Sequence, residues 1–202
     1  YGRNGLLGRR INPDGSIYRY EYDNAGRALR EIRPDGTFTS IEYNANGSIA
    51  AQIDANGNNT RFVYDVLNRL SQTIFANGTT RALVYNAKGD LVSEFDERGS
   101  ETNHEYDLAG RLSKTTDAAG NITTYGYDTF GNQNLVETAM GVVTTTFNAQ
   151  HQPVQTLFET KTTTSGTTVR AKMRVDHIFY DANGNQERLD SIDLRPDPVL
   201  MT

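Results

Sequence analysis

Seven tyrosines recur at intervals of 21 residues, and this spacing constrains the fold more than any other feature of the sequence. They are Tyr1, Tyr22, Tyr43, Tyr64, Tyr85, Tyr106 and Tyr127. A repeat of about 20–50 residues is typical of architectures in which each unit packs only against its neighbours. We therefore expect an array of small β units, and not one globular domain around a deep core.

Each repeat carries two further marks that indicate turns. An Asp or Asn follows the tyrosine from Tyr22 onward, and a Gly or Asn stands four residues after it. Another Gly stands fourteen residues after the tyrosine. Asp followed three residues later by Gly suits a type I turn, and Asp-Gly or Asn-Gly is a strong hairpin signal. Asn68 once replaces the first glycine, because Asn tolerates left-handed dihedral angles. The predicted structural signature is Tyr22, Asp23, Gly26, Gly36, Tyr43, Gly47, Gly57, Tyr64, Asp65, Gly78, Tyr85, Gly89, Gly99, Tyr106, Asp107, Gly110, Gly120, Tyr127, Asp128, Gly131, Gly141, Tyr180, Asp181 and Gly184.

The residues between the turns predict two short strands in each repeat. Polar and apolar residues alternate in Thr60-Arg61-Phe62-Val63-Tyr64, which is typical of a half-buried strand. Leu or Ile recurs six and ten residues after the tyrosine, as at Ile49 and Ile53. These even offsets predict one apolar face that also carries the tyrosines, and one polar face. The expected fold class is all-β, with consecutive antiparallel hairpins; a parallel β-helix is the alternative.

The composition fits a thin sheet and excludes several other classes. Hydrophobic residues make up 36% of the chain, which has no Trp and no Cys. The absence of Cys excludes disulfides and zinc–thiolate sites. No apolar run is long enough for a membrane span. The net charge of -5 argues against nucleic acid as the main partner. The first residue is Tyr1 and not Met, and we expect the chain to be part of a longer protein.

The repeat becomes irregular after residue 146. We expect seven tandem repeats over residues 1–146 and a degenerate region over 147–190. Phe147 replaces the tyrosine, and 33 residues separate it from Tyr180, where the motif returns. The twelve extra residues predict one elongated hairpin with a Thr-rich tip, projecting roughly 20 Å if they are shared between two strands. A Pro-containing exit segment, residues 191–202, should end strand formation at Pro196 and Pro198.

No group of residues indicates catalysis. His104, His151 and His177 lack nearby partners in the sequence and are interpreted as solvated strand residues. The segments Asp54–Asn58 and Asp181–Asn185 weakly resemble a calcium loop, but their Gly is fourth, as a turn requires, and not sixth. We therefore predict no enzyme activity, no catalytic or metal-binding residue and no cofactor.

The tandem pattern resembles the YD repeat of the RHS family. Residues 1–146 carry it in register, best in Tyr106-Asp107-Leu108-Ala109-Gly110-Arg111-Leu112 and Tyr125-Gly126-Tyr127-Asp128. The resemblance implies a spiralling antiparallel sheet that forms a hollow shell. Such shells form the body of bacterial RHS toxins, of the B and C components of Tc toxins, and of teneurins. In the bacterial members, that shell encloses a C-terminal toxin released by self-cleavage. No cleavage motif is recognisable around Asp197-Pro198.

The resemblance implies a structural role, as the wall of a secreted or cell-surface bacterial shell. Its partners would be the rest of the shell and an enclosed toxin or effector domain. The alternative is an adhesion module that binds carbohydrate or a cell-surface protein, with the tyrosine row stacking on sugar rings. We favour packing of each tyrosine against its neighbour. Because the open edges and the apolar face lack a covering layer, the isolated segment is expected to self-associate.

Overall fold

The computed structural model describes residues 5–164 and 166–194, and within those ranges the secondary structure is all β with no helix. The chain divides into an N-terminal half ending at Glu101 and a C-terminal half starting at Thr102. Tyr1 and most of the exit segment, including Pro196 and Pro198, lie outside the described residues.

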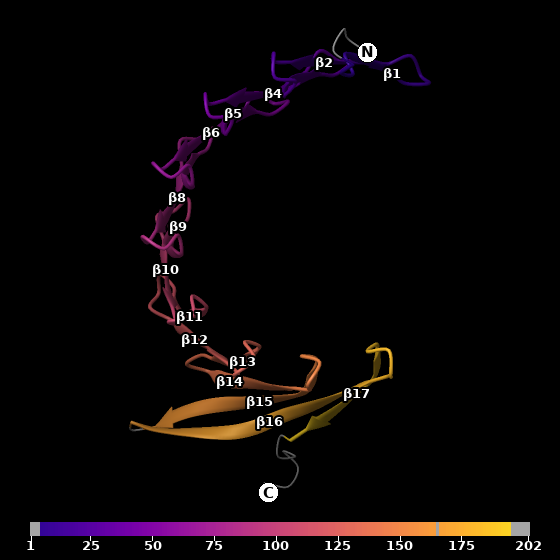
Figure 1. The fold of residues 1–202 in the computed structure, drawn as a ribbon. Coiled ribbons are helices and arrows are strands. Elements are labelled where there is room, and N and C mark those ends of the chain that lie inside the picture. Colours follow the sequence, from indigo (N-terminus) through magenta and orange to yellow (C-terminus); the bar gives the residue numbers. More distant parts are fainter. Residues whose placement is uncertain (1–4, 165, 195–202) are drawn as a thin grey trace, which may run out of the picture. The chain divides into compact units, whose positions relative to one another are not determined.

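The N-terminal half holds short strands of three to six residues (Figure 1). They are β1 (Arg9–Ile11), β2 (Ile17–Tyr22), β3 (Ala28–Ile32), β4 (Phe38–Tyr43), β5 (Ile49–Ile53), β6 (Asn59–Tyr64), β7 (Leu70–Ile74), β8 (Thr80–Tyr85) and β9 (Leu91–Phe95).

The C-terminal half begins with equally short strands and ends with longer ones. Its strands are β10 (Glu101–Tyr106, whose first residue closes the N-terminal half), β11 (Leu112–Thr116), β12 (Ile122–Tyr127), β13 (Gln133–Glu137), β14 (Gly141–Phe147), β15 (Pro153–Thr164), β16 (Thr167–Tyr180) and β17 (Gln186–Asp193).

Within each half, every strand pairs antiparallel with the next one in the chain. In β6 and β7, for example, Arg61 pairs with Ile74 and Val63 with Gln72. This pattern confirms the predicted hairpins and excludes the parallel β-helix, in which neighbouring strands would run in the same direction.

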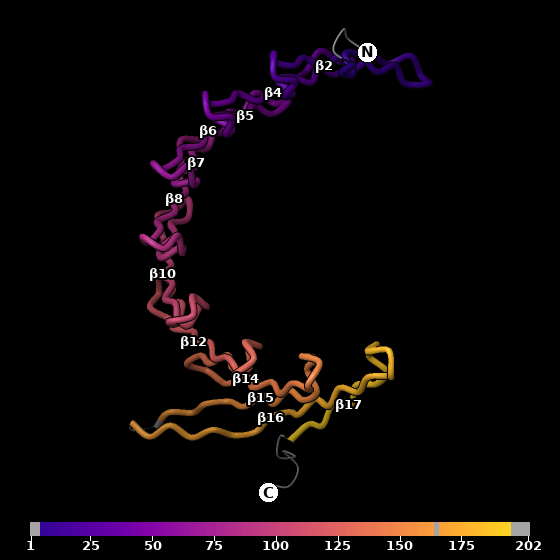
Figure 2. The backbone as a smooth tube through the Cα atoms, viewed as in Figure 1, coloured from indigo at the N-terminus to yellow at the C-terminus, as the bar shows by residue number. Residues whose placement is uncertain are grey.

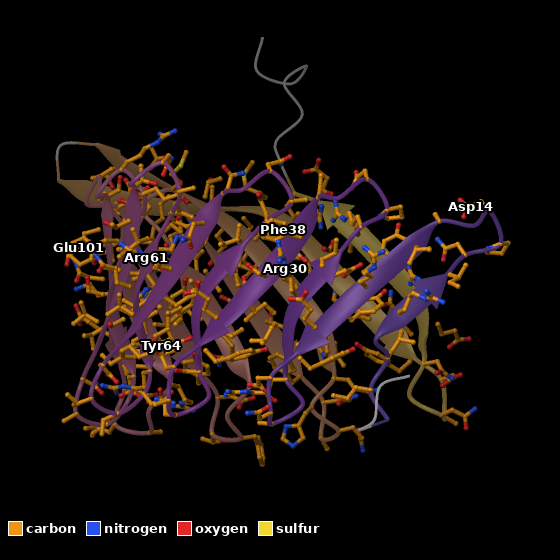
Figure 3. The ribbon with its side chains drawn as sticks, turned by 90° about the horizontal axis from the view of Figure 1, so that it is seen from above. Asp14, Arg30, Phe38, Arg61, Tyr64 and Glu101 are labelled. Carbon is orange, nitrogen blue, oxygen red and sulfur yellow. The ribbon has the colours of Figure 1, made fainter. Side chains whose placement is uncertain are left out.

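The two turns of a repeat have the same backbone geometry and lie at opposite ends of the strands. In the tyrosine-side turn, the Gly26 N–H donates to the Asp23 carbonyl and the Asp23 N–H to the Arg27 carbonyl. Gly57 and Asp54 make the equivalent bond in the second turn. Gly57 has φ +84°, and Asn68 has φ +61°, as expected for the residue that replaces glycine. Figure 3 shows Asp14 on a turn at one end of the strands and Tyr64 near the other end.

The prediction of one apolar face that bears the tyrosines is wrong, because each repeat contains a β-bulge. Tyr43 pairs with Ile49, but its neighbour Glu42 pairs with Ala51, so Ala50 has no partner. Side chains of paired residues lie on the same face of a sheet. The extra residue therefore reverses which face the following residues of the strand occupy. Ile49 therefore shares the face of Tyr43, whereas Ile53, paired with Ser40, lies on the opposite face.

Because apolar residues lie on both faces of the sheet, few side chains are fully buried. The buried residues of the described chain are Ala51, Ser93, Val142 and Asp176. Ser93 lies under Glu101, to which its hydroxyl donates a 2.7 Å hydrogen bond. On the same face as Ala51, the Arg30 guanidinium carbon lies 3.7 Å from the centre of the Phe38 ring (Figure 3). Each half is thus stabilised by contacts along one layer and not by a two-layer core.

Gly141 differs from the other predicted turn glycines. The Thr138 N–H donates directly to the Gly141 carbonyl, so this turn is shorter than the others and Gly141 is the first residue of β14. The missing turn residue accounts for the 20-residue spacing between Tyr127 and Phe147. Gly141 is required for close approach, because a Cβ atom there would lie 2.5 Å from the Glu159 carbonyl oxygen.

The predicted elongated hairpin is formed by β15 and β16 (Figure 2). Pairing with β14 ends at Thr160, and pairing with β17 ends at Arg174. The strands continue together to the pair Thr164–Thr167. At 3.3 Å per residue, the hairpin extends about 13 Å past the end of β14 and roughly 20 Å past that of β17. The projection therefore matches the predicted length on the β17 side and is shorter than predicted on the β14 side.

Candidate functional site

The signature tyrosines connect each repeat to the one before it. The Tyr64 hydroxyl donates a 2.9 Å hydrogen bond to the Ile49 carbonyl, fifteen residues earlier. The same bond is made by Tyr22 to Leu7, Tyr43 to Ala28, Tyr127 to Leu112 and, across 27 residues, Tyr180 to Pro153. Tyrosines of consecutive repeats lie two strands apart, about 9.5 Å, so a strand separates them. The prediction that each tyrosine packs on its neighbour is therefore replaced by docking onto the preceding repeat's backbone.

An arginine in every second repeat covers the following tyrosine. The Arg27, Arg69 and Arg111 guanidinium carbons lie 4.3–4.5 Å from the ring centres of Tyr43, Tyr85 and Tyr127. Each arginine also pairs with the aspartate of its own turn, at 2.6–2.7 Å. We name this set of contacts the Asp–Arg–Tyr ladder. It links each arginine-bearing repeat to its successor, and the spacing of the arginines is 42 residues.

From the sequence we predicted no role for these arginines, although Arg111 stands within the quoted YD motif. At the same place the intervening repeats carry Ser48, Asp90 and Asn132, which bond within their own turn. The signal that reveals the arginines is their 42-residue spacing, which a search for a 21-residue repeat averages out.

The turn aspartates are occupied by bonds that close their own turns. In Asp54, Oδ1 accepts the Asn56 and Asn58 backbone N–H groups, and Oδ2 accepts the Asn58 side chain. The hydrogen bond from the Asn58 side-chain amide is the main cause of the lowered pKa of the Asp54 carboxyl. In Asp65 the main cause is the Arg69 backbone N–H. These carboxylates act as turn-closing acceptors in the ionised form.

The described residues contain no group of three or more His, Asp or Glu side chains arranged to hold a metal ion. The interpretation of the three histidines as solvated strand residues is wrong, because His104 and His177 lie on strands but are half-buried, and His151 is exposed but lies in a turn. His151 takes the place of the turn glycine in the degenerate repeat, at φ +62°, and its ring meets the edge of Phe130 with 5.7 Å between ring centres. It also lies 3.1 Å from the Asn132 side-chain oxygen.

Several charged contacts of the C-terminal half involve residues of the long hairpin. Glu137 pairs with Lys161 and, at 3.0 Å, with Arg170. The Lys161 ammonium also donates to the Thr138 carbonyl. Glu137, Thr138 and Lys161 border a 480 Å³ hollow that Asn121 and Thr124 also line. Asp176 is buried beside Arg174, whose hydrogen bond lowers the pKa of the carboxyl. All these charges are paired within the chain.

Together these observations define a class of protein: an antiparallel array of β-hairpin repeats in a single layer, in which residues at fixed spacing make the turns and the inter-repeat contacts. The family model "RHS Repeat" matches residues 3–37, 43–80, 85–122 and 106–139, which cover more than half of the sequence. The chain belongs to the RHS repeat family, as its YD motifs indicated. The starts of the first three matches are 40 and 42 residues apart, close to the period of the ladder arginines.

Solved structures of Tc toxin proteins share the fold. The crystal structure of TcdB2-TccC3-TEV has a TM-score of 0.74 at 17% identity and covers 93% of this chain. That of TcdB2-TccC3-Cdc42 has a TM-score of 0.72 at 17% identity and covers 89%. The Photorhabdus luminescens Tc holotoxin pore has a TM-score of 0.70 at 17% identity and covers 89%. This chain spans only 11–12% of the length of those chains.

No curated protein sequence matches the chain significantly. In the ranges that the structure describes, no helix is long and apolar enough to cross a membrane.

Proposed function

We propose that this chain is a wall segment of a larger RHS-repeat protein, and that the complete wall encloses or displays a C-terminal toxin or effector domain outside this chain. The observation that carries the proposal is the Asp–Arg–Tyr ladder within a single-layer sheet. Tyrosine hydroxyls bind the backbone of the preceding repeat, as at Tyr64, and in every second repeat an arginine also covers the following tyrosine, as Arg69 covers Tyr85. Such a layer extends by adding repeats and presents two broad faces.

The likeness to TcdB2-TccC3 structures supports the same role, because almost the whole chain superimposes on a small part of a much longer protein. As a wall segment of a bacterial toxin, the protein would act outside the cell, and it would itself need no catalytic residues. Its partners would be the remaining repeats and the enclosed domain.

The adhesion alternative receives little support from the tyrosine row. A sugar ring would have to stack on the tyrosine face, and at Tyr43, Tyr85 and Tyr127 a guanidinium group already lies over the ring. At Tyr64 and Tyr127 the hydroxyl group is already bound to a backbone carbonyl.

Protease protection in the full-length protein tests the wall function. We expect the region after the repeats to resist a protease concentration that degrades the same region expressed alone. Combined Arg27→Ala, Arg69→Ala and Arg111→Ala substitutions should weaken that protection. Equal cleavage in both contexts would contradict enclosure. Tight binding of one sugar, lost in Tyr64→Ala and retained in Arg61→Ala, would favour adhesion instead.

A further inference from the structure

The tripeptide Ala-Asn-Gly occurs four times in the sequence, each time in a turn that joins two strands. Its asparagines are Asn46, Asn56, Asn77 and Asn183, and all four are exposed. The glycine that follows each of them has a positive φ. An Asn-Gly pair is chemically reactive, because glycine has no side chain to keep its backbone nitrogen from the preceding carboxamide. The four turns therefore show how local contacts differ around an identical tripeptide.

Two of these asparagines are held by the residue that follows the glycine. In Asn77, Oδ1 accepts the Thr79 backbone N–H at 3.0 Å and the Thr79 hydroxyl at 2.7 Å. In Asn46, Oδ1 accepts the same two groups of Ser48, and Nδ2 donates to the Asn68 side-chain oxygen at 2.7 Å. These bonds fix both carboxamides in one orientation.

The other two asparagines lack such bonds, because an aspartate two residues earlier takes the donors. Asp54 Oδ1 accepts the Asn58 backbone N–H at 2.9 Å, and Oδ2 accepts the Asn58 side-chain amide at 2.8 Å. Within the described ranges, no hydrogen bond reaches the Asn56 side chain, although its backbone N–H donates to Asp54. Asn183 lies in the identical sequence at 181–185, with the same bonds.

We propose that Asn56 and Asn183 are sites of spontaneous deamidation. Asn46 and Asn77, in the same tripeptide, are protected by their bonds. The turn tolerates the resulting carboxylate, because the preceding repeat carries Asp35 at the position of Asn56. Each conversion adds one negative charge, and the isoaspartate product lengthens the turn by one main-chain carbon. The inference does not depend on the wall function.

The reaction needs a carboxamide that can rotate towards the glycine nitrogen. The Gly57 backbone nitrogen bonds to Asn56 Cγ, the Cγ–Nδ2 bond breaks, and ammonia leaves with the proton of the Gly57 N–H. Water then opens the five-membered imide at either carbonyl, giving aspartate or isoaspartate. In Asn77 the same rotation first breaks both bonds to Thr79. The Gly57 and Gly78 N–H groups each donate within their own turn, at 3.0 and 2.9 Å, so breaking that bond costs both sites equally.

Peptide mapping by mass spectrometry, after incubation of the folded protein in mildly alkaline buffer, tests the proposal. We expect conversion at Asn56 and Asn183 to be at least about tenfold faster than at Asn46 and Asn77, which corresponds to about 1.4 kcal/mol. In denaturant the four rates should become similar, because the tripeptides are identical. Equal rates at Asn56 and Asn77 in the folded protein would overturn the proposal. So would a difference that persists in denaturant, since its cause would then be the sequence alone.

An exchange of turn residues provides a matched variant. Asp54→Phe combined with Asn58→Thr gives the turn of Asn56 the same five residues as the turn of Asn77. The introduced hydroxyl and the released N–H should then hold the Asn56 side chain and slow its conversion about tenfold. An unchanged rate in this variant would contradict the protection argument.

A second variant acts in the opposite direction and preserves the side-chain shape. Thr79→Val removes the hydroxyl bond to Asn77 and keeps the β-branched side chain and the backbone N–H. We expect conversion at Asn77 to accelerate about threefold to tenfold, with the rate at Asn56 unchanged. No acceleration at Asn77 would contradict the proposal even if the exchanged turn failed to fold. Equal acceleration at Asn56 would also contradict it, because the cause would then be general loosening of the fold.

Discussion

The Arg69 guanidinium carbon lies 4.5 Å from the centre of the Tyr85 ring, and the two residues belong to consecutive repeats. Arg69 is held there by Asp65 of its own turn, at 2.6 Å. The contact joins neighbours that have no common core, since each half is one layer. Inter-repeat contacts of this kind decide the stability of a linear array.

Arg69→Ala should lower the free energy of unfolding by about 1 kcal/mol, through lost cation–π contact and packing over Tyr85. Arg61→Ala, on an exposed strand position, is the control and should change it by less than about 0.5 kcal/mol. Urea unfolding followed by circular dichroism measures both. Equal effects would show that the ladder arginine contributes nothing beyond an ordinary surface residue.

Gly57→Ala should cost about 1–2 kcal/mol, because φ is +84° and an added Cβ strains the backbone. The surrounding space is open, with no atom within 4 Å of that Cβ, so the cost reports the dihedral angle alone. Asn68→Gly, at φ +61°, is the reciprocal change and should not destabilise by more than about 0.5 kcal/mol. Thermal melts of both variants test the turn geometry; a Gly57→Ala melt identical to wild type would refute it.

Gly141→Ala should destabilise for a different reason, with a cost of about 1–3 kcal/mol from overpacking. Its Cβ would collide with the Glu159 carbonyl oxygen of β15. Faster amide exchange in β14 and β15, with β10 to β12 unchanged, is the expected local signature. Unaltered exchange in β15 would mean that the strands do not approach as closely as described.

Acid should loosen the turns. The folded pKa of Asp54 and Asp65 is lowered relative to the unfolded chain, by bonds from Asn58 and Arg69 respectively. Their stabilising contribution is therefore complete above the unfolded pKa of about 4 and is lost as pH falls through the lower, folded value. The melting temperature should decline below about pH 4. Asp54→Asn should flatten that decline slightly, and a melting temperature independent of pH in this range would contradict the assignment.

The sequence predicted the elements and the turns well, because Tyr, Asp and Gly at fixed offsets have direct backbone causes. It did not predict the faces. The bulge at Ala50 depends on which residues pair, and nothing in the residue types at that place, such as Ala50 or Ser71, indicates an unpaired residue. Likewise, Gly141 has the offset of a turn glycine, and only the position of Glu159 reveals that it serves close strand approach.

The contacts of the candidate site were predicted in part. The tyrosines and aspartates were in the signature. The aspartates bond within their own turns, but the partners of the tyrosines lie in the preceding repeat. Tyr64 binds Ile49, and Arg170 reaches Glu137 across 33 residues. Such pairs depend on the register of several hairpins, which a one-dimensional pattern does not contain.

Electron cryomicroscopy of the full-length protein that contains this chain tests the wall function most directly. We predict a closed shell around separate internal density, with β2 to β16 forming part of its wall in a single layer. A protein whose repeats form an open rod, with the remaining domains outside it and no enclosed volume, would contradict the wall function.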